Sequence, residues 1–234
     1  MPAIEVRCTV RSFKMLTPTV YELSFDTEPG FEFKAGQFVS VVVPGAGPKG
    51  RDLRRAYSIA SAPEMRPVEL CIKVVEDGPG SNYLYKLRPN DTFKGYVPYG
   101  DFTYEAKEGR HAFFISTGTG IAPFRAMVMS DDFKKAPPVS AKCIIGVRTE
   151  DELLYEKDFQ DLPVEWIPAV SQPAGGWSGF KGRVTDYLRS LGNDFPWKET
   201  EYYLCGNGAM ITEVKAILAE KGVDKESIHQ EKYY

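Results

Sequence analysis

The chain has 234 residues, which is enough for one large domain or for two domains of ordinary size. Apolar residues make up 43% of it and charged residues 26%, as in a globular protein with substantial cores, and the net charge of −3 argues against nucleic-acid binding. No apolar run approaches the length that spans a bilayer and no signal peptide is visible, so we expect a cytoplasmic protein.

The four cysteines, Cys8, Cys71, Cys143 and Cys205, are far apart in the chain. Zinc and iron–sulfur sites need closely spaced cysteines, so we expect no metal site. Three of the four lie in apolar, strand-like runs that are typical of reduced core residues.

The first half of the chain predicts a β-rich module. Apolar or alternating runs are separated by turn residues such as Pro29-Gly30 and the loop 44–50. The predicted strands are residues 4–13, 20–25, 37–43, 55–61, 68–75 and 92–97. Six short strands of this kind favour a barrel or a sandwich.

One predicted strand carries the sequence Arg55-Ala56-Tyr57-Ser58. Alternation places Arg55 and Tyr57 on one face of the strand, and Ala56 and Ser58 on the other. A planar ligand with phosphates suits these groups, because Tyr57 can stack on a ring, Arg55 can pair with a phosphate and Ser58 can reach a ring edge. A bulge or twist is needed for Tyr57 and Ser58 to reach one ligand. The alternative is an ordinary strand with a surface arginine.

Two further features of the first half suit anions. Residues 51–55 contain three arginines, which fits either a solvated loop or a docking site for phosphates or an acidic partner. Residues 82–87 form a predicted helix, with Ser81 as its N-cap directly after Gly80. Free N–H groups at a helix start bind anions, although many helices begin after glycine without doing so.

The second half alternates strands and helices, the pattern of an open, doubly wound parallel sheet. Predicted strands are residues 111–116, 141–147, 164–170 and 201–204, and predicted helices are the stretch up to Met129, residues 152–159, residues 183–190 and the stretch from Asn207 to Gly222. Ligands of such sheets bind beyond the carboxyl ends of the strands. Residues 116–120 and 205–208 occupy such ends, so we expect them to face one nucleotide; core packing is the alternative for Cys205.

Four motifs occur in order along most of the chain: Ala-Gly-Gln-Phe at 35–38, Arg-Ala-Tyr-Ser at 55–58, Gly-Thr-Gly-Ile-Ala-Pro at 118–123 and Cys-Gly at 205–206. Together they resemble the ferredoxin–NADP reductase superfamily. The resemblance implies two domains: a FAD-binding antiparallel β-barrel over residues 1–105, and an NAD(P)-binding, doubly wound α/β domain over residues 106–234.

The resemblance also implies roles for individual residues. Arg55 would contact a flavin phosphate, Tyr57 would stack on the isoalloxazine, and Ser58 would hydrogen-bond near flavin N5. Gly80 and Ser81 resemble a second phosphate contact, which favours FAD over FMN. The implied contacts to the nicotinamide dinucleotide are its pyrophosphate loop, Thr117, Gly118, Thr119, Gly120 and Pro123, and, beside the nicotinamide ring, Cys205 and Gly206.

The C-terminal residues Glu231-Lys232-Tyr233-Tyr234 resemble the Glu-x-Tyr ending of plant-type members, whose last aromatic residue covers the flavin until nicotinamide displaces it. Glu231 and Tyr233 match by spacing, and Tyr234 is an additional residue, so either tyrosine can be the one that stacks. A frayed tail is the alternative. Ser58, Cys205 and Glu231 are the catalytic residues that the resemblance implies.

One departure from the family concerns the coenzyme. NADP-specific relatives place an arginine after the Ser or Thr that follows the third strand of this domain, whereas this sequence has Ser171-Gln172-Pro173. Gln172 cannot supply the charge that a 2′-phosphate needs. Arg148, Lys181 or Arg183 can substitute for it, so NADPH and NADH both stay open.

The implied function is a flavoprotein oxidoreductase that passes hydride between NAD(P)H and FAD, and single electrons to or from a separate carrier protein. The flavin performs the redox chemistry, while the protein orients the rings and excludes water. Ferredoxin, flavodoxin or an oxygenase component is the expected carrier, attracted by the arginines of residues 51–55. Two alternatives remain: a reductase of free flavin, which the helix start at Gly80-Ser81 argues against, and a non-catalytic nucleotide-binding subunit or sensor.

Overall fold

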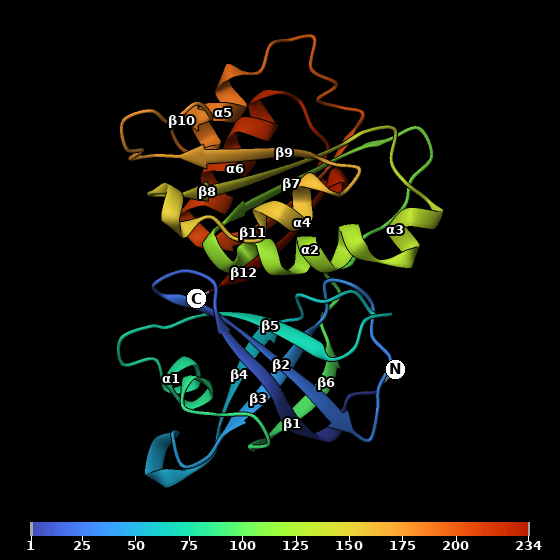
Figure 1. The fold of residues 1–234 in the computed structure, drawn as a ribbon. Coiled ribbons are helices and arrows are strands. Elements are labelled where there is room, and N and C mark those ends of the chain that lie inside the picture. The colour runs from blue at the N-terminus through green and yellow to red at the C-terminus, as the bar shows by residue number, and fades with distance from the viewer. Residues whose placement is uncertain (1, 234) are drawn as a thin grey trace.

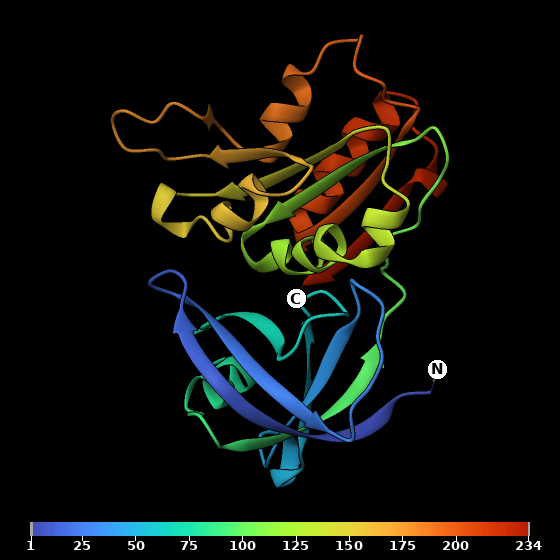
Figure 2. The ribbon, with the colours of Figure 1, turned by 45° about the vertical axis from the view of Figure 1, so that its right-hand side comes forward.

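The computed structural model describes residues 2–233, which form two modules, one above the other in Figure 1. The N-terminal module is a curled antiparallel sheet, and the C-terminal module is a parallel sheet between helices (Figures 1 and 2). A segment between β6 (Thr92–Tyr99) and β7 (His111–Thr117) joins them. Glu105 lies in this segment, and we propose the domain boundary directly after it.

The N-terminal module is an antiparallel barrel with the strand order β4-β3-β6-β1-β2-β5. Its remaining strands are β1 (Ile4–Met15), β2 (Val20–Glu28), β3 (Phe38–Val43), β4 (Leu53–Ser58) and β5 (Val68–Lys73). The two edge strands meet where Ile59, just after β4, pairs with Leu70 of β5. This bridge and the hydrogen bond from the Ala60 amide to the Glu69 carbonyl oxygen draw the sheet into a barrel rather than a sandwich.

Alternation along the strands builds the barrel core. In β1, Val6, Cys8 and Val10 are buried, while Arg7 between the first two faces outward. The inward side chains pack with those of the other strands in one apolar cluster. The two-residue period that predicts these strands therefore also decides which side chains form the core.

α1 (Pro79–Tyr85), between β5 and β6, corrects one prediction. The helix begins three residues earlier than expected, with Gly78 rather than Ser81 at the N-cap. A proline suits the first helical position, because its φ angle is helical and its missing N–H is not needed there. Ser81 lies inside the helix, where its hydroxyl accepts a hydrogen bond from the Val75 amide and donates one to the Gly78 carbonyl, both at 3.2 Å.

The C-terminal module is a parallel sheet with the strand order β10-β9-β8-β7-β11-β12. Its other strands are β8 (Ala141–Val147), β9 (Glu165–Val170), β10 (Phe180–Lys181), β11 (Thr200–Asn207) and β12 (Ile228–Tyr233). Its helices are α2 (Ala122–Met129), α3 (Asp131–Lys135), α4 (Glu156–Gln160), α5 (Val184–Ser190) and α6 (Gly208–Glu220). No helix within residues 2–233 is long and apolar enough to cross a bilayer.

Helices cover both faces of this sheet, which confirms the doubly wound prediction. Phe124 of α2 and Phe159 of α4 belong to the core on one face, and Leu188 of α5 and Val214 of α6 to the core on the other. The strand order reverses between β7 and β11, and ligands of such sheets bind beyond the strand ends at that point. β12 runs toward the boundary between the modules (Figure 1).

Some elements of this module differ from the sequence-based expectation. The helix predicted at 152–159 is divided into a 3₁₀ turn, Glu150–Glu152, and α4, because Tyr155 between them has a left-handed φ of 57°. The strand predicted at 201–204 continues to Asn207, so Cys205 and Gly206 lie inside β11. Residues 228–233, for which no strand is predicted, form β12, which pairs in parallel with β11 and excludes the alternative of a frayed tail for Glu231 to Tyr233.

The ends of α6 follow the prediction. The side chain of Asn207 accepts a 2.8 Å hydrogen bond from the Ala209 amide and so caps the helix. Gly222, just beyond the helix, has a φ of 73°, a conformation that favours glycine. The predicted apolar stripe of Met210, Ile211, Val214, Ile217 and Leu218 is buried.

Candidate active site

Ser58 lies at the end of β4, with its side chain against the C-terminal strand of the other module. Its hydroxyl donates a 2.9 Å hydrogen bond to Oε2 of Glu231. The hydroxyl of Tyr233 donates a 2.8 Å hydrogen bond to Ser58 Oγ. Ser58 is 6% exposed, so these bonds are shielded from bulk water.

Cys205 lies beside these three residues. In the parallel pairing of β11 with β12, Cys205 stands opposite Glu231. Cys205 is fully buried, and its thiol hydrogen-bonds with the Tyr233 hydroxyl. The structure thus gathers the three residues predicted as catalytic, together with Tyr233, into one group that we call the junction cluster: Ser58, Cys205, Glu231 and Tyr233.

Burial controls the protonation of the junction cluster. It raises the pKa of the Glu231 carboxyl, and the hydrogen bond from Ser58 offsets only part of this rise. Burial also raises the pKa of the Tyr233 hydroxyl and of the Cys205 thiol. Cys205 is therefore a neutral thiol at ordinary pH, which suits packing and orientation rather than nucleophilic attack.

Arg55 and Tyr57 lie against the start of α1. A β-carbon on Gly80 would come within 2.4 Å of the Tyr57 hydroxyl oxygen and 2.9 Å of Arg55 Cγ, so the glycine permits this close approach. Burial raises the pKa of Tyr57 to about 12. Tyr57 contacts α1 whereas Ser58 contacts β12, which confirms that these two neighbours point to opposite faces of the strand, and Ala56, which lies between Arg55 and Tyr57, is exposed.

The guanidinium of Arg55 is exposed and donates a 3.0 Å hydrogen bond to the Arg54 carbonyl. Arg54 itself is engaged by the barrel, because it donates to Ser40 Oγ and the Tyr99 hydroxyl and lies 4.3 Å from the centre of the Tyr96 ring. Arg54 is thus held in place, whereas the guanidinium of Arg55 is exposed and its stem lies against Gly80.

A cleft of about 640 Å³ opens at the carboxyl ends of the parallel strands. Of the residues predicted to contact the nicotinamide dinucleotide, those that line it are Thr117, Gly118, Thr119 and Gly206. The others, Gly120, Pro123 and Cys205, are buried. Tyr233 also lines the cleft, so the cleft reaches the junction cluster; Tyr234 lies outside the described residues.

Two glycines bring the ends of β7 and β11 together. Gly206 has a φ of +132°, and a β-carbon there would lie 2.4 Å from Thr117 Oγ1. A β-carbon on Gly120 would lie 2.3 Å from the carbonyl oxygen of Cys205. Thr117 Oγ1 in turn accepts a 3.0 Å hydrogen bond from the Asn207 amide. The two loops therefore face one cleft, as the sequence predicts.

Some residues that line the cleft could not be predicted from the sequence. Thr17, Thr19 and Lys73 reach it from the barrel, a contact that only domain packing creates. Thr185, near the start of α5, is 2% exposed, and its hydroxyl has no hydrogen-bond partner among the described residues. A buried hydroxyl without a partner suits a bound ligand, so this wall and the two close glycines fit a dinucleotide.

Of the three basic residues that could bind a 2′-phosphate according to the sequence, two line the cleft and one does not. Arg148, directly after β8, and Arg183, directly before α5, line the cleft together with Ser171 and Gln172. Lys181 is not among the lining residues. Positions that follow a parallel strand are visible in the sequence, but which of them share a wall depends on the strand order.

Comparisons with known proteins agree with this geometry. Residues 7–104 match the oxidoreductase FAD-binding domain, and residues 114–216 match the oxidoreductase NAD-binding domain. Ferredoxin--NADP reductase B of Sorangium cellulosum (strain So ce56) is 31% identical over 231 residues, which cover 93% of each chain. The chain belongs to the ferredoxin–NADP reductase family.

Further relatives of this ferredoxin reductase include the phenol hydroxylase P5 protein of Acinetobacter pittii (strain PHEA-2). It is 29% identical, and the match covers 98% of this chain but 65% of the relative, so this chain spans about two thirds of that protein. The ferredoxin reductase in carbazole 1,9a-dioxygenase has the same fold, with a TM-score of 0.86 and 21% identity over 100% of this chain and 70% of that one.

A ferredoxin NADP+ reductase from Neisseria gonorrhoeae with bound FAD and NADP also shares the fold, with a TM-score of 0.80 and 22% identity over the whole of both chains. The family models assign one nucleotide to each module of this ferredoxin reductase: FAD to the barrel and NAD(P) to the parallel sheet. It is a FAD-dependent NAD(P)H oxidoreductase of the ferredoxin reductase type.

Proposed function

We propose that this reductase passes hydride between NAD(P)H and FAD at the junction cluster and exchanges single electrons with a separate carrier protein. The observation that carries the proposal is the pair of hydrogen bonds that join Ser58 to Glu231 and Tyr233. These bonds bring the flavin-binding strand to the mouth of the nucleotide cleft, beside Cys205. A bound flavin supplies both two-electron and one-electron chemistry.

The side chains of the site hold and orient the two rings. Arg55 and Tyr57, which lie against Gly80, would hold the phosphate and the ring of the flavin. The Ser58 hydroxyl, which now donates to Glu231, is placed to donate to the edge of the flavin ring instead. Tyr233, which lines the cleft and bonds to Ser58, would cover the flavin ring in the absence of nicotinamide. Burial of the junction cluster excludes water, which strengthens the electrostatic interactions within it.

The cleft favours NADPH over NADH as coenzyme. Arg148 and Arg183 line it, and no described residue forms an ion pair with either guanidinium. Of the carboxylates in the same walls, Glu213 is paired with Arg189, and Glu152 accepts a hydrogen bond from the Arg148 amide. The 2′-phosphate of NADPH offers the charged oxygens that arginine binds in a fork geometry, whereas the ribose hydroxyl of NADH does not.

A ferredoxin, a flavodoxin or an oxygenase component is the proposed electron carrier. The names of the relatives point to such carriers, since they are a ferredoxin–NADP reductase and a phenol hydroxylase protein. The cysteines within the described residues are dispersed and buried, so the carrier's redox centre lies outside these residues. The free, buried cysteines also suit a reducing compartment, and we place the protein in the cytoplasm.

The decisive experiment is anaerobic reduction of the purified protein. We expect the protein to stay yellow through desalting and its flavin absorbance to bleach within a stopped-flow trace on addition of NADPH, more slowly with NADH. Reduction of cytochrome c should then depend on added ferredoxin or flavodoxin and should weaken as salt is raised.

Three results would contradict the proposal in different ways. A colourless protein that reduces added flavin would indicate a free-flavin reductase. A yellow protein that neither coenzyme bleaches would indicate a nucleotide-binding subunit without redox activity. A protein whose flavin is bleached by the coenzyme but which reduces no carrier would contradict the proposed one-electron step.

A further inference from the structure

Arg125 lies in α2, at the boundary between the two modules, and its side chain is 8% exposed. Its guanidinium makes three hydrogen bonds: one of 3.0 Å to the carbonyl oxygen of Ala60, one of 2.6 Å to Glu69 and one of 2.6 Å to Asp158. A buried arginine with this many partners is held in one orientation, because its planar fork allows few alternatives.

The partners of Arg125 come from both modules. Ala60 and Glu69 belong to the barrel, while Asp158 belongs to α4 of the nucleotide-binding module. Ala60 is two residues beyond Ser58, and its amide bonds to the Glu69 carbonyl where the barrel closes. The guanidinium therefore binds the continuation of the strand that carries the flavin motif.

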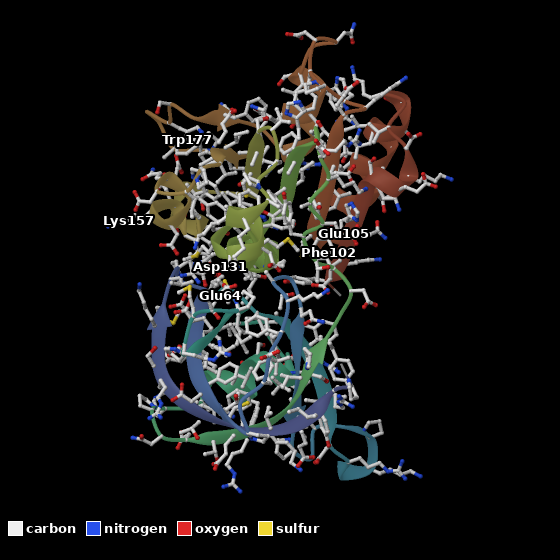
Figure 3. All side chains as sticks on the ribbon, turned by 90° about the vertical axis from the view of Figure 1, so that its right-hand side faces the viewer. Glu64, Phe102, Glu105, Asp131, Lys157 and Trp177 are labelled. Carbon is white, nitrogen blue, oxygen red and sulfur yellow. The ribbon has the colours of Figure 1, made fainter. Side chains whose placement is uncertain are left out.

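The other end of this connection is the nucleotide loop. α2 follows directly on the 3₁₀ turn Gly118–Ile121, which carries the predicted pyrophosphate contacts. One side chain thus links the helix that follows the nucleotide loop to the strand that ends at Ser58. The link bypasses the covalent connection between the modules, which runs through Glu105 and the polar segment around it (Figure 3).

A second contact supports the first. The ring of Tyr155, just before α4, lies 4.4 Å from the Arg125 guanidinium. The Tyr155 hydroxyl reaches back across the boundary and donates a 2.9 Å hydrogen bond to Glu22 of β2. Arg125 and Tyr155 therefore form a stacked pair, and each member of the pair bonds to a carboxylate of the barrel.

The remaining contacts at this boundary are mostly apolar. Ala35 and Phe102 of the barrel side pack with Phe124 and Met127 of α2 in one core. Apolar burial holds surfaces together but has little directional preference, so it permits sliding. At the far edge of the boundary, the Asp131 amide donates to Glu64 at 3.3 Å (Figure 3). Apart from the hydrogen bonds that Ser58 itself makes with Glu231 and Tyr233, the hydrogen bond from Arg125 to Ala60 is the directional contact across the boundary that lies nearest to Ser58 along the chain.

The guanidinium of Arg125 balances the negative charge of three carboxylates at the boundary between the modules. Glu22 and Glu69 from the barrel and Asp158 from α4 all lie near this group. Without it, the carboxylates of Glu69 and Asp158 would stay close together with no cation between them, and a partly buried charge without a partner is strongly unfavourable. Loss of the guanidinium should therefore loosen or tilt the modules, not merely remove one bond.

We propose that Arg125 is a positioning residue that holds the nucleotide-binding module at a fixed orientation to the flavin-binding strand and so sets the approach of the two rings. This inference rests on the proposed function of the junction cluster. Arg125 does not touch the cluster, and it acts through Ala60 and through α2. Misplacement of reacting groups by about 1 Å can slow a reaction about a hundredfold, so a small tilt is enough to be measured.

The two ion pairs of Arg125 provide a matched test. Glu69→Gln removes the charged contact that crosses the boundary, and Asp158→Asn removes the equally short contact within one module. Arg125→Met removes the charge, and Arg125→Lys keeps the charge without the fork. Each purified holoprotein is measured for its flavin reduction rate at saturating NADPH, its charge-transfer absorbance and its amide hydrogen exchange in residues 58–69 and 122–129.

We expect Arg125→Met to slow flavin reduction at least tenfold, to lose charge-transfer absorbance and to speed exchange in both segments, with coenzyme affinity changed less than the rate. Glu69→Gln and Arg125→Lys should move the same quantities in the same direction by smaller factors. Asp158→Asn should stay within about twofold of wild type in rate and charge-transfer absorbance.

Two outcomes would overturn the inference. One is equal behaviour of Glu69→Gln and Asp158→Asn, which would make Arg125 an ordinary stabilising residue. The other is a wild-type rate and charge-transfer band in Arg125→Met, or in Arg125→Lys and Glu69→Gln if the methionine variant does not fold. If neither coenzyme reduces even the wild-type protein, the proposed function fails, whereas the exchange measurements still report whether Arg125 holds the modules.

Discussion

The hydroxyl of Tyr233 donates a 2.8 Å hydrogen bond to the hydroxyl of Ser58, which lies 175 residues earlier in the chain. Ser58 ends a barrel strand, and Tyr233 ends a strand that pairs in parallel with β11. Because both residues are held by regular hydrogen-bonded strands, their contact is a defined junction between the modules. A frayed tail could not maintain it.

Replacement of Tyr233 tests whether its ring occupies the nicotinamide position. In Tyr233→Ser the ring no longer competes, so we expect NADPH to bind roughly tenfold more tightly, with stronger charge-transfer absorbance, because the competent state no longer has to displace it. Tyr233→Phe keeps the ring and loses only the hydrogen bonds to Ser58 and Cys205, so its affinity should stay near that of wild type. Unchanged titrations in the serine variant would contradict this role.

Replacement of Tyr57 tests the flavin site. Loss of the ring in Tyr57→Ala should weaken FAD binding by about 2 kcal/mol, or roughly thirtyfold, the size of an aromatic stacking contact with a nucleobase. Tyr57→Phe retains the ring against Gly80 and serves as the control. Equilibrium dialysis or fluorescence titration of the apoprotein measures the difference. Equal FAD retention in the alanine variant and wild type would show that Tyr57 does not stack on the flavin.

Arg148 and Arg183 should decide the coenzyme. Either Arg148→Ala or Arg183→Ala is expected to raise KM for NADPH about tenfold or more and to leave KM for NADH within about twofold, because a charge-assisted contact to the 2′-phosphate is worth roughly 1.5 to 3 kcal/mol. Lys181→Ala is the control, since Lys181 is not among the residues that line the cleft. Equal increases in KM for NADPH and NADH would show that the arginines bind a part of the coenzyme that both molecules share, rather than the 2′-phosphate.

The stability contributions of two glutamates, the half-buried Glu231 and the buried Glu201, should respond to pH with opposite signs. Burial raises the pKa of Glu231 above its ordinary 4.5, so the folded state favours the protonated carboxyl. The protonated carboxyl therefore contributes to the stability of the fold at low pH, and this contribution is lost as pH rises through the raised pKa. Glu231→Gln should therefore have a higher Tm than wild type at pH 8. The difference should vanish at about pH 4, where the wild-type carboxyl is also protonated. Differential scanning fluorimetry across this range measures it.

Glu201 is the opposite case and the control for Glu231. Burial works to raise its pKa, but hydrogen bonds from Lys107, His229 and Arg110 outweigh burial and lower it below 4.5. Its contribution is present above 4.5 and is lost as pH falls through the lowered pKa. Glu201→Gln should destabilise the protein by about 3 kcal/mol at neutral pH, since it breaks a buried ion cluster. A pH-independent difference in both variants would contradict the two shifts.

Gly206 should not tolerate a side chain. Its φ of +132° and a would-be β-carbon 2.4 Å from Thr117 Oγ1 predict that Gly206→Ala loses about 2 kcal/mol, or roughly 4 to 8 °C in Tm. Gly175→Ala is the matched control, because a β-carbon on Gly175 meets no atom within 4 Å. Comparable melting temperatures for the two variants would mean that β7 and β11 approach less closely than the structure shows.

Much of the architecture follows from local patterns. The barrel strands and the sheet strands appear in the sequence as two-residue alternation or continuous apolar runs, and α6 is bounded by Asn207 and Gly222 as its caps predict. β12 escaped prediction because His229, Gln230 and Lys232 give it a polar composition. Its strand conformation comes from pairing with β11, which is a contact between distant parts of the chain.

The sequence by itself determined the kinds of groups and the strands that carry them: Arg55, Tyr57 and Ser58 on one barrel strand, and two glycine loops at sheet strand ends. Only the tertiary structure decided which of them meet. Ser58 reaches Tyr233, Arg125 reaches Ala60, and Arg148 shares a cleft with Arg183, because barrel curvature, strand order and domain packing bring them together. Side-chain periodicity is a property of neighbouring residues, whereas these contacts depend on the three-dimensional course of the whole chain.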